Sequence, residues 1–158
     1  VSCWEDLNPE LMVIEGQGSL MNPAYPGGFE ILAAGRPHVV VMQHAPARRE
    51  YDGFPGYVLH DIQRQIEAVE LLSDRPVVGI TVNHEGLVGS PAEAGVAAGR
   101  DTPDAILAVC KELEATTGLP TEDPLVHGVR RVVDEIVKQM QQWRQSRQDA
   151  PRYEEDRR

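Results

Sequence analysis

The chain carries, at Leu11-Met12-Val13-Ile14-Glu15-Gly16-Gln17-Gly18-Ser19, four apolar residues followed by a carboxylate and a glycine-punctuated turn. Consecutive apolar residues are typical of a strand buried on both faces, as in parallel sheets, so residues 10–15 are predicted to form the first strand. Ligands of such sheets bind beyond the carboxyl ends of the strands. Glu15 is therefore expected at the rim of a site, where it could bind Mg²⁺ or act as a base, and Gly16 and Gly18 would let the backbone approach a ligand. The alternative is an ordinary turn with a surface Glu.

The bulk composition is that of one globular domain, since 158 residues with 41% hydrophobic and 25% charged side chains suffice for a core. The formal charge of -10 would repel a phosphate backbone, so nucleic-acid binding is not expected. Cys3 and Cys110 are too few for a disulfide framework, and no apolar run reaches the roughly 20 residues of a membrane span. No signal pattern opens the chain. A cytoplasmic protein without membrane contact is expected.

Alternating apolar and amphipathic stretches predict the remaining elements. Strands are expected at 39–42 and 77–82, and helices at 59–73, 102–118 and 126–143, with a short extended piece at 119–124. A Gly/Ala-rich loop insert is expected at 84–101. The domain is expected to comprise residues 1–143, and residues 144–158 are expected to form a charged disordered tail. This alternation predicts an α/β fold with a parallel sheet flanked by helices. So few strands leave bare sheet edges. Further strands are therefore expected from an upstream part of the polypeptide or from a partner subunit, as in a homo-oligomer.

Polar residues follow the two later strands. The strand at 39–42 is followed by His44, and the strand at 77–82 is followed by Asn83-His84-Glu85. The carboxyl ends of parallel strands meet at one edge, so these residues are expected near Glu15. The histidines other than His44 are scattered, and no pair among them has the spacing of a zinc site, so no transition-metal centre is expected; they are His38, His60, His84 and His127. Cys110 is interpreted as a small buried apolar residue rather than a nucleophile.

Four segments resemble a known family: 13–20, 22–25, 37–44 and 78–83. They are similar to the C-terminal half of the D-glutamate N-acetyltransferase-like family, long carried as a domain of unknown function, and the likeness covers roughly residues 9–137. Its specific part is the run E-G-Q-G-S-L-x-x-P-x-Y. The resemblance implies a P-loop NTPase-like α/β fold, similar to dethiobiotin synthetase, whose first βα unit carries the phosphate loop. No G-x-x-x-x-G-K-[ST] occurs in this chain, so that unit is expected upstream.

The resemblance also implies a reaction, the transfer of an acetyl group from acetyl-CoA to the amine of an acidic amino acid such as D-glutamate. A base must take the amine proton, and fixed donors must stabilise the oxyanion. Glu15 and His44 are the candidate bases, although His44 could equally be a loop histidine. Arg48 and Arg49 are candidates to bind the acidic substrate or a coenzyme A phosphate, or else are merely solvated.

The remaining candidates for substrate or phosphate binding lie in the resembling segments. They are Gly16, Gln17, Gly18, Ser19, Tyr25 and Asn83. Tyr25 could shape the pocket by stacking or through its hydroxyl group. Asn83 could read a substrate edge, or could simply form the turn after its strand.

Two other functions stay open. One is a nucleotide-binding enzyme with an ATP- and Mg²⁺-dependent ligase or kinase-like activity. In that case Glu15 would hold the metal, and Ser19 or the glycine amides would contact the substrate. The other is an incomplete, non-catalytic half-domain whose sheet edge pairs with another subunit. Without its phosphate-binding wall, the chain alone is expected to bind substrate weakly or not at all.

Overall fold

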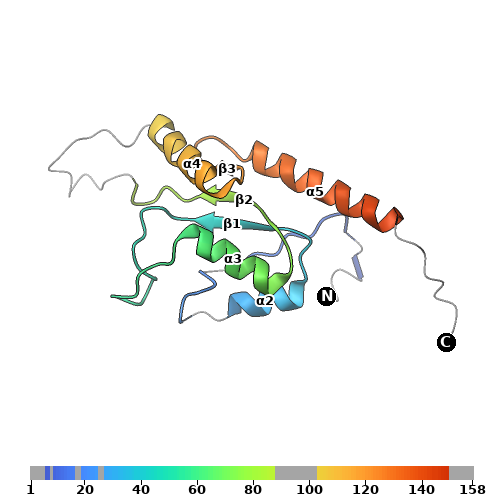
Figure 1. Cartoon of the computed structure of the whole chain (residues 1–158), viewed down its shortest axis with the longest axis horizontal. Coiled ribbons are helices and arrows are strands. Elements are labelled where there is room, and N and C mark those ends of the chain that lie inside the picture. Colours follow the sequence, from blue (N-terminus) through green and yellow to red (C-terminus); the bar gives the residue numbers. More distant parts are fainter. Residues whose placement is uncertain (1–5, 8, 17–18, 25–26, 88–102, 150–158) are drawn as a thin grey trace.

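The computed structural model describes residues 6–7, 9–16, 19–24, 27–87 and 103–149. The elements along the chain are α2 (Gly27–Gly35), β1 (Val40–His44), α3 (Ile62–Ser73), β2 (Val77–Val82), α4 (Pro103–Thr117), β3 (Thr121–Glu122) and α5 (Arg130–Asp149) (Figure 1). Strands and helices alternate from β1 onward, so the predicted α/β class is confirmed. The strand predicted at 77–82 has the observed bounds.

The three strands form one parallel sheet in the order β1-β2-β3. In this sheet His44 of β1 lies opposite Val82, and Ile80 of β2 lies opposite Thr121. The central strand β2 is buried at all but one of its positions, which agrees with its apolar sequence. Because all three strands run the same way, their carboxyl ends share one edge of the sheet, at the left of Figure 1.

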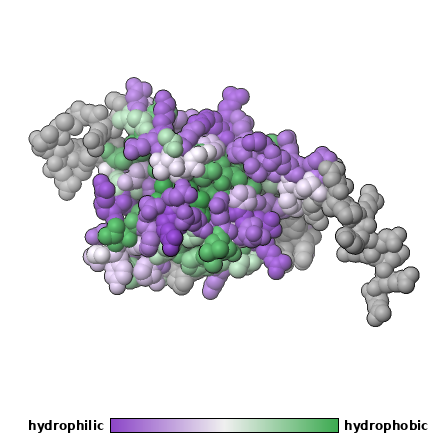
Figure 2. Space-filling model, viewed as in Figure 1, coloured by the Kyte–Doolittle hydropathy of each residue, from purple (hydrophilic) through white to green (hydrophobic). Residues whose placement is uncertain are grey.

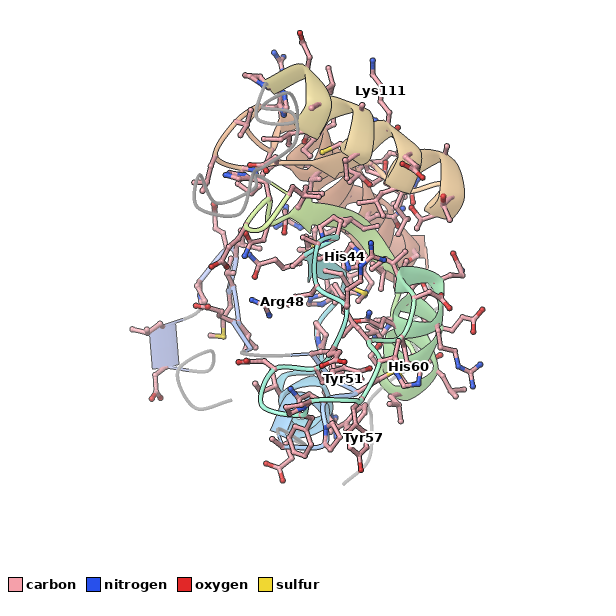
Figure 3. The ribbon with its side chains drawn as sticks, turned by 90° about the vertical axis from the view of Figure 1, so that its left-hand side faces the viewer. His44, Arg48, Tyr51, Tyr57, His60 and Lys111 are labelled. Atoms are coloured by element: carbon pink, nitrogen blue, oxygen red, sulfur yellow. The ribbon has the colours of Figure 1, made fainter. Side chains whose placement is uncertain are left out.

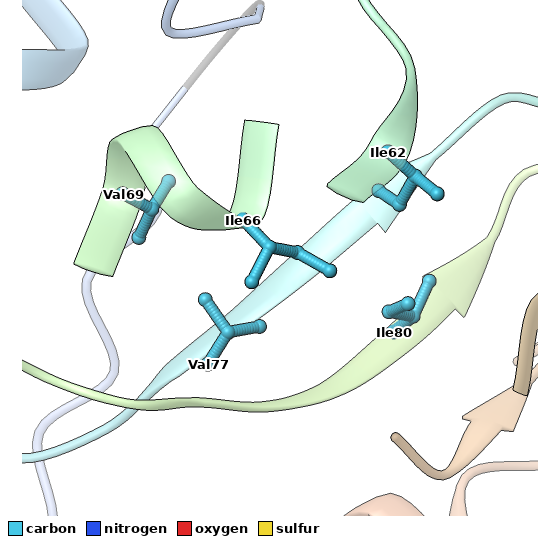
Figure 4. Packing of buried hydrophobic residues seen from close by; sticks show 5 residues of the cluster. All are labelled: Ile62, Ile66, Val69, Val77 and Ile80. Atoms are coloured by element: carbon cyan, nitrogen blue, oxygen red, sulfur yellow. The ribbon is translucent and has the colours of Figure 1, made fainter. Parts of the chain in front are cut away.

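Helices α3 and α5 cover opposite faces of β2. Ile80 is fully buried and clusters with Ile62 and Ile66 of α3 (Figure 4). At the preceding residue, Gly79, a Cβ atom would lie 2.9 Å from a methyl carbon of Val132 in α5. Successive residues of a strand point to opposite faces, so the sheet is sandwiched between the two helices.

Helix α3 begins later than predicted because Asp61 caps it. The Asp61 backbone is extended, and its carboxylate accepts a hydrogen bond from the Arg64 N–H at 2.8 Å. At the other end, Asp74 adopts the left-handed conformation, with φ of 54°, and its N–H donates to the Glu70 carbonyl. Pro76 follows and leads directly into β2.

The strand predicted at 10–15 is wrong in this structure, since residues 11–16 form no strand. Leu11, Val13 and Ile14 are 60%, 83% and 48% exposed. The segment runs along α2 instead, where the Ile14 Cδ1 atom would lie 2.9 Å from a Cβ placed at Gly35. An apolar run becomes a strand only if a neighbouring strand takes its backbone hydrogen bonds, and within the described residues β1 pairs with β2 alone.

Helix α2 was not among the predicted elements. It starts at two glycines, and a Cβ at Gly28 would lie 3.0 Å from the Leu20 Cγ atom, so glycine lets the preceding segment approach the helix. It ends where Arg36 adopts a positive φ of 43° and Pro37 follows. This helix has no fully buried residue, and its apolar residues are not gathered on one face, so it lacks the periodicity that predicts an amphipathic helix.

Helix α5 differs from its prediction in its buried face and its length. The helical spacing of Val126, Val129, Val133 and Ile136 predicts an apolar face that includes Val133. Val133 is 45% exposed, however, whereas the neighbouring Val132 is 2% exposed. The Val132 side chain packs against Gly79 of β2, and its N–H donates to the Glu122 carboxylate of β3 at 3.0 Å. The helix also continues through Asp149, because its internal hydrogen bonds need no burial. Part of the stretch predicted as a disordered tail is therefore helical, and 150–158 lies outside the described residues.

The surface is mostly polar. Figure 2 shows hydrophilic residues over much of one face, with smaller apolar areas between them. Within the described ranges, no helix combines the length and the hydropathy needed to cross a membrane.

Candidate functional site

The carboxyl edge of the sheet brings together polar residues from all three strands. His44 ends β1, Asn83 and His84 follow β2, and Asp123 follows β3. The Asn83 N–H donates to the His44 carbonyl at 2.8 Å, which ties the ends of β1 and β2 together. Figure 3 looks onto this edge, with His44 near its centre. The prediction that His44 and Asn83 share one edge is confirmed.

His84 and Asp123 form a close pair. The His84 Nδ1 atom lies 2.6 Å from the Asp123 Oδ2 atom. A carboxylate only accepts hydrogen bonds, so Nδ1 is the donor, and the neutral ring then carries its lone pair on Nε2. The His84 side chain is 27% exposed, whereas that of Asp123 is fully buried. The pair therefore joins a buried carboxylate to an imidazole at the surface.

The Asp123 carboxylate is held in place by its own loop. Its Oδ1 atom accepts hydrogen bonds from the backbone N–H groups of Leu125 and Val126, at 2.9 and 3.2 Å. The backbone carbonyl of Asp123 accepts a further bond from the His127 N–H. A side chain with both oxygens occupied cannot rotate freely, so it presents Oδ2 to His84 in one orientation.

An apolar cluster lies behind this pair. It contains Val82 of β2 and Ile106 and Cys110 of α4, and all three are buried. Cys110 is 1% exposed, which confirms its interpretation as a buried residue. Burial raises the pKa of its thiol, and the nearby charge of Asp123 raises it further. A thiol of this kind is a poor nucleophile at neutral pH.

His44 has a different environment. The residue is half-buried, and burial lowers the pKa of its imidazole below the ordinary 6.5. The ring is therefore neutral at pH 7. In the part of the chain that the structure describes, no hydrogen bond to this ring is found, and no carboxylate orients it.

Arg48 brings a positive charge to the same edge. It lies in the loop after β1, and its guanidinium is 3.9 Å from the carboxylate of Glu85, the residue after His84. Both side chains are more than half exposed, so the pair is weak and its guanidinium is accessible to a ligand. Arg49 is also exposed, and its carbonyl accepts a hydrogen bond from the Leu59 N–H.

The loop that carries Arg48 is anchored by buried polar groups. The Tyr51 hydroxyl lies 2.6 Å from the Nδ1 atom of His60, and Tyr51 is 5% exposed. The Asn22 side chain donates to the Asp52 carbonyl at 3.2 Å, so the segment before α2 also holds this loop. Figure 3 shows Tyr51 and His60 on the α3 side of His44.

Two further predicted site residues are engaged in local structure. The Ser19 hydroxyl donates to the Gln65 side chain of α3 at 3.3 Å. The Asn83 Oδ1 atom accepts from the Glu85 N–H at 2.9 Å, which is the turn-forming role. These contacts position both residues but do not by themselves indicate a ligand.

The remaining predicted residues are not gathered at this edge. Because residues 11–16 form no strand, Glu15 does not end one; it is exposed, and no ion pair or hydrogen bond to its carboxylate is found among the described residues. Gly16 is exposed beside it. Gln17, Gly18 and Tyr25 lie outside the described residues. The described ranges also hold no group of three side chains that could bind a metal.

Sequence reasoning missed the His84–Asp123 pair. His84 was grouped with scattered histidines, and Asp123 was not considered. A signal was present, since Asp123 directly follows β3 and His84 is the second residue after β2. What the sequence did not reveal is that these two strands are neighbours.

Residues 1–133 match a family model described as "Domain of unknown function (DUF1611_C) P-loop domain". The chain belongs to the DUF1611 family. The matched region includes His44, Arg48, His84 and Asp123, so the whole carboxyl edge lies within it. The predicted P-loop-like α/β class and the family resemblance are both confirmed.

Two curated proteins named D-glutamate N-acetyltransferase are similar to this DUF1611 chain. The protein from Tritonibacter scottomollicae is 31% identical over 130 residues, which is 78% of this chain and 35% of that protein. The protein from Pseudoalteromonas sp is 33% identical over 128 residues, which is 77% of this chain and 34% of that protein. The chain thus spans about a third of the length of these relatives.

Proposed function

We propose that the intact protein transfers an acetyl group from acetyl-CoA to the amine of an acidic amino acid such as D-glutamate. The observation that carries this proposal is that histidines and the Arg48 guanidinium lie at one edge of the sheet, in a chain of which more than three quarters is similar to two proteins named D-glutamate N-acetyltransferase. The N-acetyltransferase class rests on those relatives. The choice of an acidic acceptor rests also on Arg48.

The reaction has two requirements that this edge suits. An ammonium group must lose a proton before its nitrogen can attack a thioester, and a histidine near neutrality is suited to accept it. The acceptor's side-chain carboxylate must be held, and a guanidinium can do so with two parallel hydrogen bonds. Without such a cation, a chain with a formal charge of -10 would repel an acidic substrate.

The direct test mixes the intact protein with acetyl-CoA and D-glutamate and follows the release of free thiol. Thiol should appear only with the acceptor present. Its release should be faster with D-glutamate than with L-glutamate, and faster than with D-glutamine, whose side chain is uncharged. Absence of thiol release by correctly folded protein with any acidic amino acid would contradict the proposal.

Arg48→Met tests the role of the cation. Loss of a charge-assisted hydrogen bond of about 1.5–3 kcal/mol should raise the KM for D-glutamate roughly 10- to 100-fold, with a smaller effect on kcat. Arg75→Met is the matched control, because Arg75 is an exposed arginine just before the amino end of β2. Equal effects of the two substitutions would show that Arg48 does not bind the acceptor.

A second candidate is an ATP- and Mg²⁺-dependent activity, which the description of the family as a P-loop domain favours. In that case Glu15 would help to hold the metal. Titration calorimetry of the intact protein with Mg-ATP tests it, and Glu15→Gln should weaken binding without lowering Tm, because Glu15 is exposed. No binding of Mg-ATP would remove this candidate.

A further inference from the structure

We propose that His84 accepts the proton of the substrate amine and that Asp123 is the positioning residue for its ring. This inference rests on the proposed acetyl transfer and assigns its base to a residue other than Glu15 and His44. It is carried by the geometry of the carboxyl edge, where a buried carboxylate holds a partly exposed imidazole.

The first argument concerns the imidazole itself. The Asp123 carboxylate accepts a hydrogen bond from the Nδ1–H group of His84 at 2.6 Å, so the lone pair of the neutral ring is on Nε2. No hydrogen bond to Nε2 is found within the described residues, and the side chain is 27% exposed. A ring held in this tautomer, with its second nitrogen at the surface, is ready to accept a proton from a ligand.

The second argument concerns the carboxylate. Asp123 is fully buried against an apolar cluster, where an ion is costly unless it is hydrogen-bonded. Its Oδ1 atom accepts hydrogen bonds from the backbone N–H groups of Leu125 and Val126 in the turn that follows. Exposed ion pairs are worth little, whereas a buried carboxylate fixes the direction of the histidine that it holds.

The other candidate bases lack such a partner. Burial lowers the pKa of His44, which weakens it as a base, and no carboxylate is found to orient it among the described residues. His60 shares its Nδ1 atom with the Tyr51 hydroxyl, a neutral partner. Glu15 is exposed and has no orienting contact in the described part of the chain.

The charged groups next to His84 include three carboxylates and one cation that could hold the carboxylate of an acidic amino acid. Besides Asp123, the neighbours are Glu85 in the same turn and Arg48, which faces Glu85. Glu122 of β3 is engaged with the Val132 N–H on the α5 side. Arg48 therefore supplies the local positive charge for a substrate carboxylate, while Nε2 of His84 meets the ammonium group.

The step balances as follows. Nε2 of His84 takes one proton from the ammonium group, and the neutral amine nitrogen then forms a bond to the thioester carbonyl carbon. The C–S bond breaks as the tetrahedral intermediate collapses, and the second amine proton ends on the departing coenzyme A thiolate. His84 returns its proton to water, so the products are the N-acetyl amino acid, coenzyme A and one proton.

The first experiment reads the ring without relying on activity. Two-dimensional ¹⁵N–¹H spectra of the histidine side chains in the intact protein should show His84 protonated on Nδ1 and not on Nε2. In Asp123→Asn the new amide can still accept the two backbone bonds but must donate to Nδ1, so the proton should move to Nε2. A wild-type ring protonated on Nε2 alone, or a ring unaffected by D123N, would overturn the inference.

The second experiment measures catalysis by His84→Gln, with His127→Gln as the control from the loop that follows Asp123. H84Q should lose about 100-fold or more in kcat at pH 7, with little change in the KM for acetyl-CoA, whereas H127Q should keep wild-type activity. The loss should shrink as the pH approaches the pKa of the substrate ammonium group, since more amine is then neutral without a base. A purely structural defect would be the same at every pH.

The outcomes separate the two proposals. If the wild-type protein releases no thiol, the proposed function is wrong and the assignment of the base falls with it. If the wild-type protein is active but H84Q keeps more than half of its kcat, or loses activity equally at all pH values, the function stands and the role of His84 is wrong. Retained acetyl-CoA binding and an unchanged Tm show that H84Q is folded.

Discussion

Gly79 is predicted to be required for the contact between the sheet and α5. A Cβ atom at this position would lie 2.9 Å from Cγ1 and 3.2 Å from Cγ2 of Val132. The first distance is too short for two carbon atoms, which prefer about 3.5–4.0 Å. Val132 is 2% exposed and β-branched, so it has little freedom to move aside.

The expected cost of Gly79→Ala follows from two opposing effects. Overpacking by one methyl group destabilises a core by about 1–3 kcal/mol. Replacing glycine by alanine also restricts the unfolded chain, which stabilises the folded state by about 0.4–1 kcal/mol. The net loss in the free energy of unfolding is therefore about 1–2 kcal/mol, a substantial part of the roughly 5–15 kcal/mol of a typical domain.

The assay is urea unfolding followed by far-UV circular dichroism, carried out on four proteins: wild type, G79A, V132A and the double variant. G79A should be destabilising alone but stabilising by about 0.4–1 kcal/mol in the V132A background, where the clash is gone. The two effects then differ by about 2 kcal/mol. The reasoning is refuted if G79A is neutral in the wild type, or if it has the same effect in both backgrounds.

Two further predictions concern the ends of α3 and β1. Asp61→Ala should lower the free energy of unfolding in urea by about 1 kcal/mol, because the N-cap bond to Arg64 is lost; Asp61→Ser should keep most of it. Burial lowers the pKa of His44 in the folded state. Below about pH 6.5 the unfolded chain therefore binds more protons than the folded one. The free energy of unfolding then decreases as the pH is lowered, until the pH falls below the lowered pKa of the folded state. Tm measured from pH 8 to 5 should therefore fall less for His44→Gln than for the wild type, and equal slopes would contradict this.

Much of the fold could be predicted where burial itself shapes the sequence. The strand at 77–82 is central in the sheet and apolar except at Thr81, so its bounds were predicted correctly. Helix α3 has its buried residues at helical spacing, and its predicted start differs from the observed one, Ile62, by three residues. Helix α2 has no fully buried residue, and its sequence therefore carried no clear signal.

The errors arose where neighbours decide the outcome. Residues 11–14 have the composition of a buried strand, but no strand pairs with them among the described residues. Leu11, Val13 and Ile14 are exposed there. On α5 the buried valine is Val132 rather than Val133, because Gly79 of β2 leaves space for the Val132 side chain. Periodicity alone allows either face.

The sequence by itself determined the α/β class, the parallel strands and the presence of polar residues such as His44 and Asn83 after those strands, because apolar runs and turn residues are local features of the chain. Only the tertiary structure decided which of those residues meet. His84 and Asp123 are 39 residues apart, and their contact depends on β3 lying beside β2 in one register. Hydrogen bonding between strands fixes that register through backbone atoms, which every residue shares, so no local pattern could reveal it.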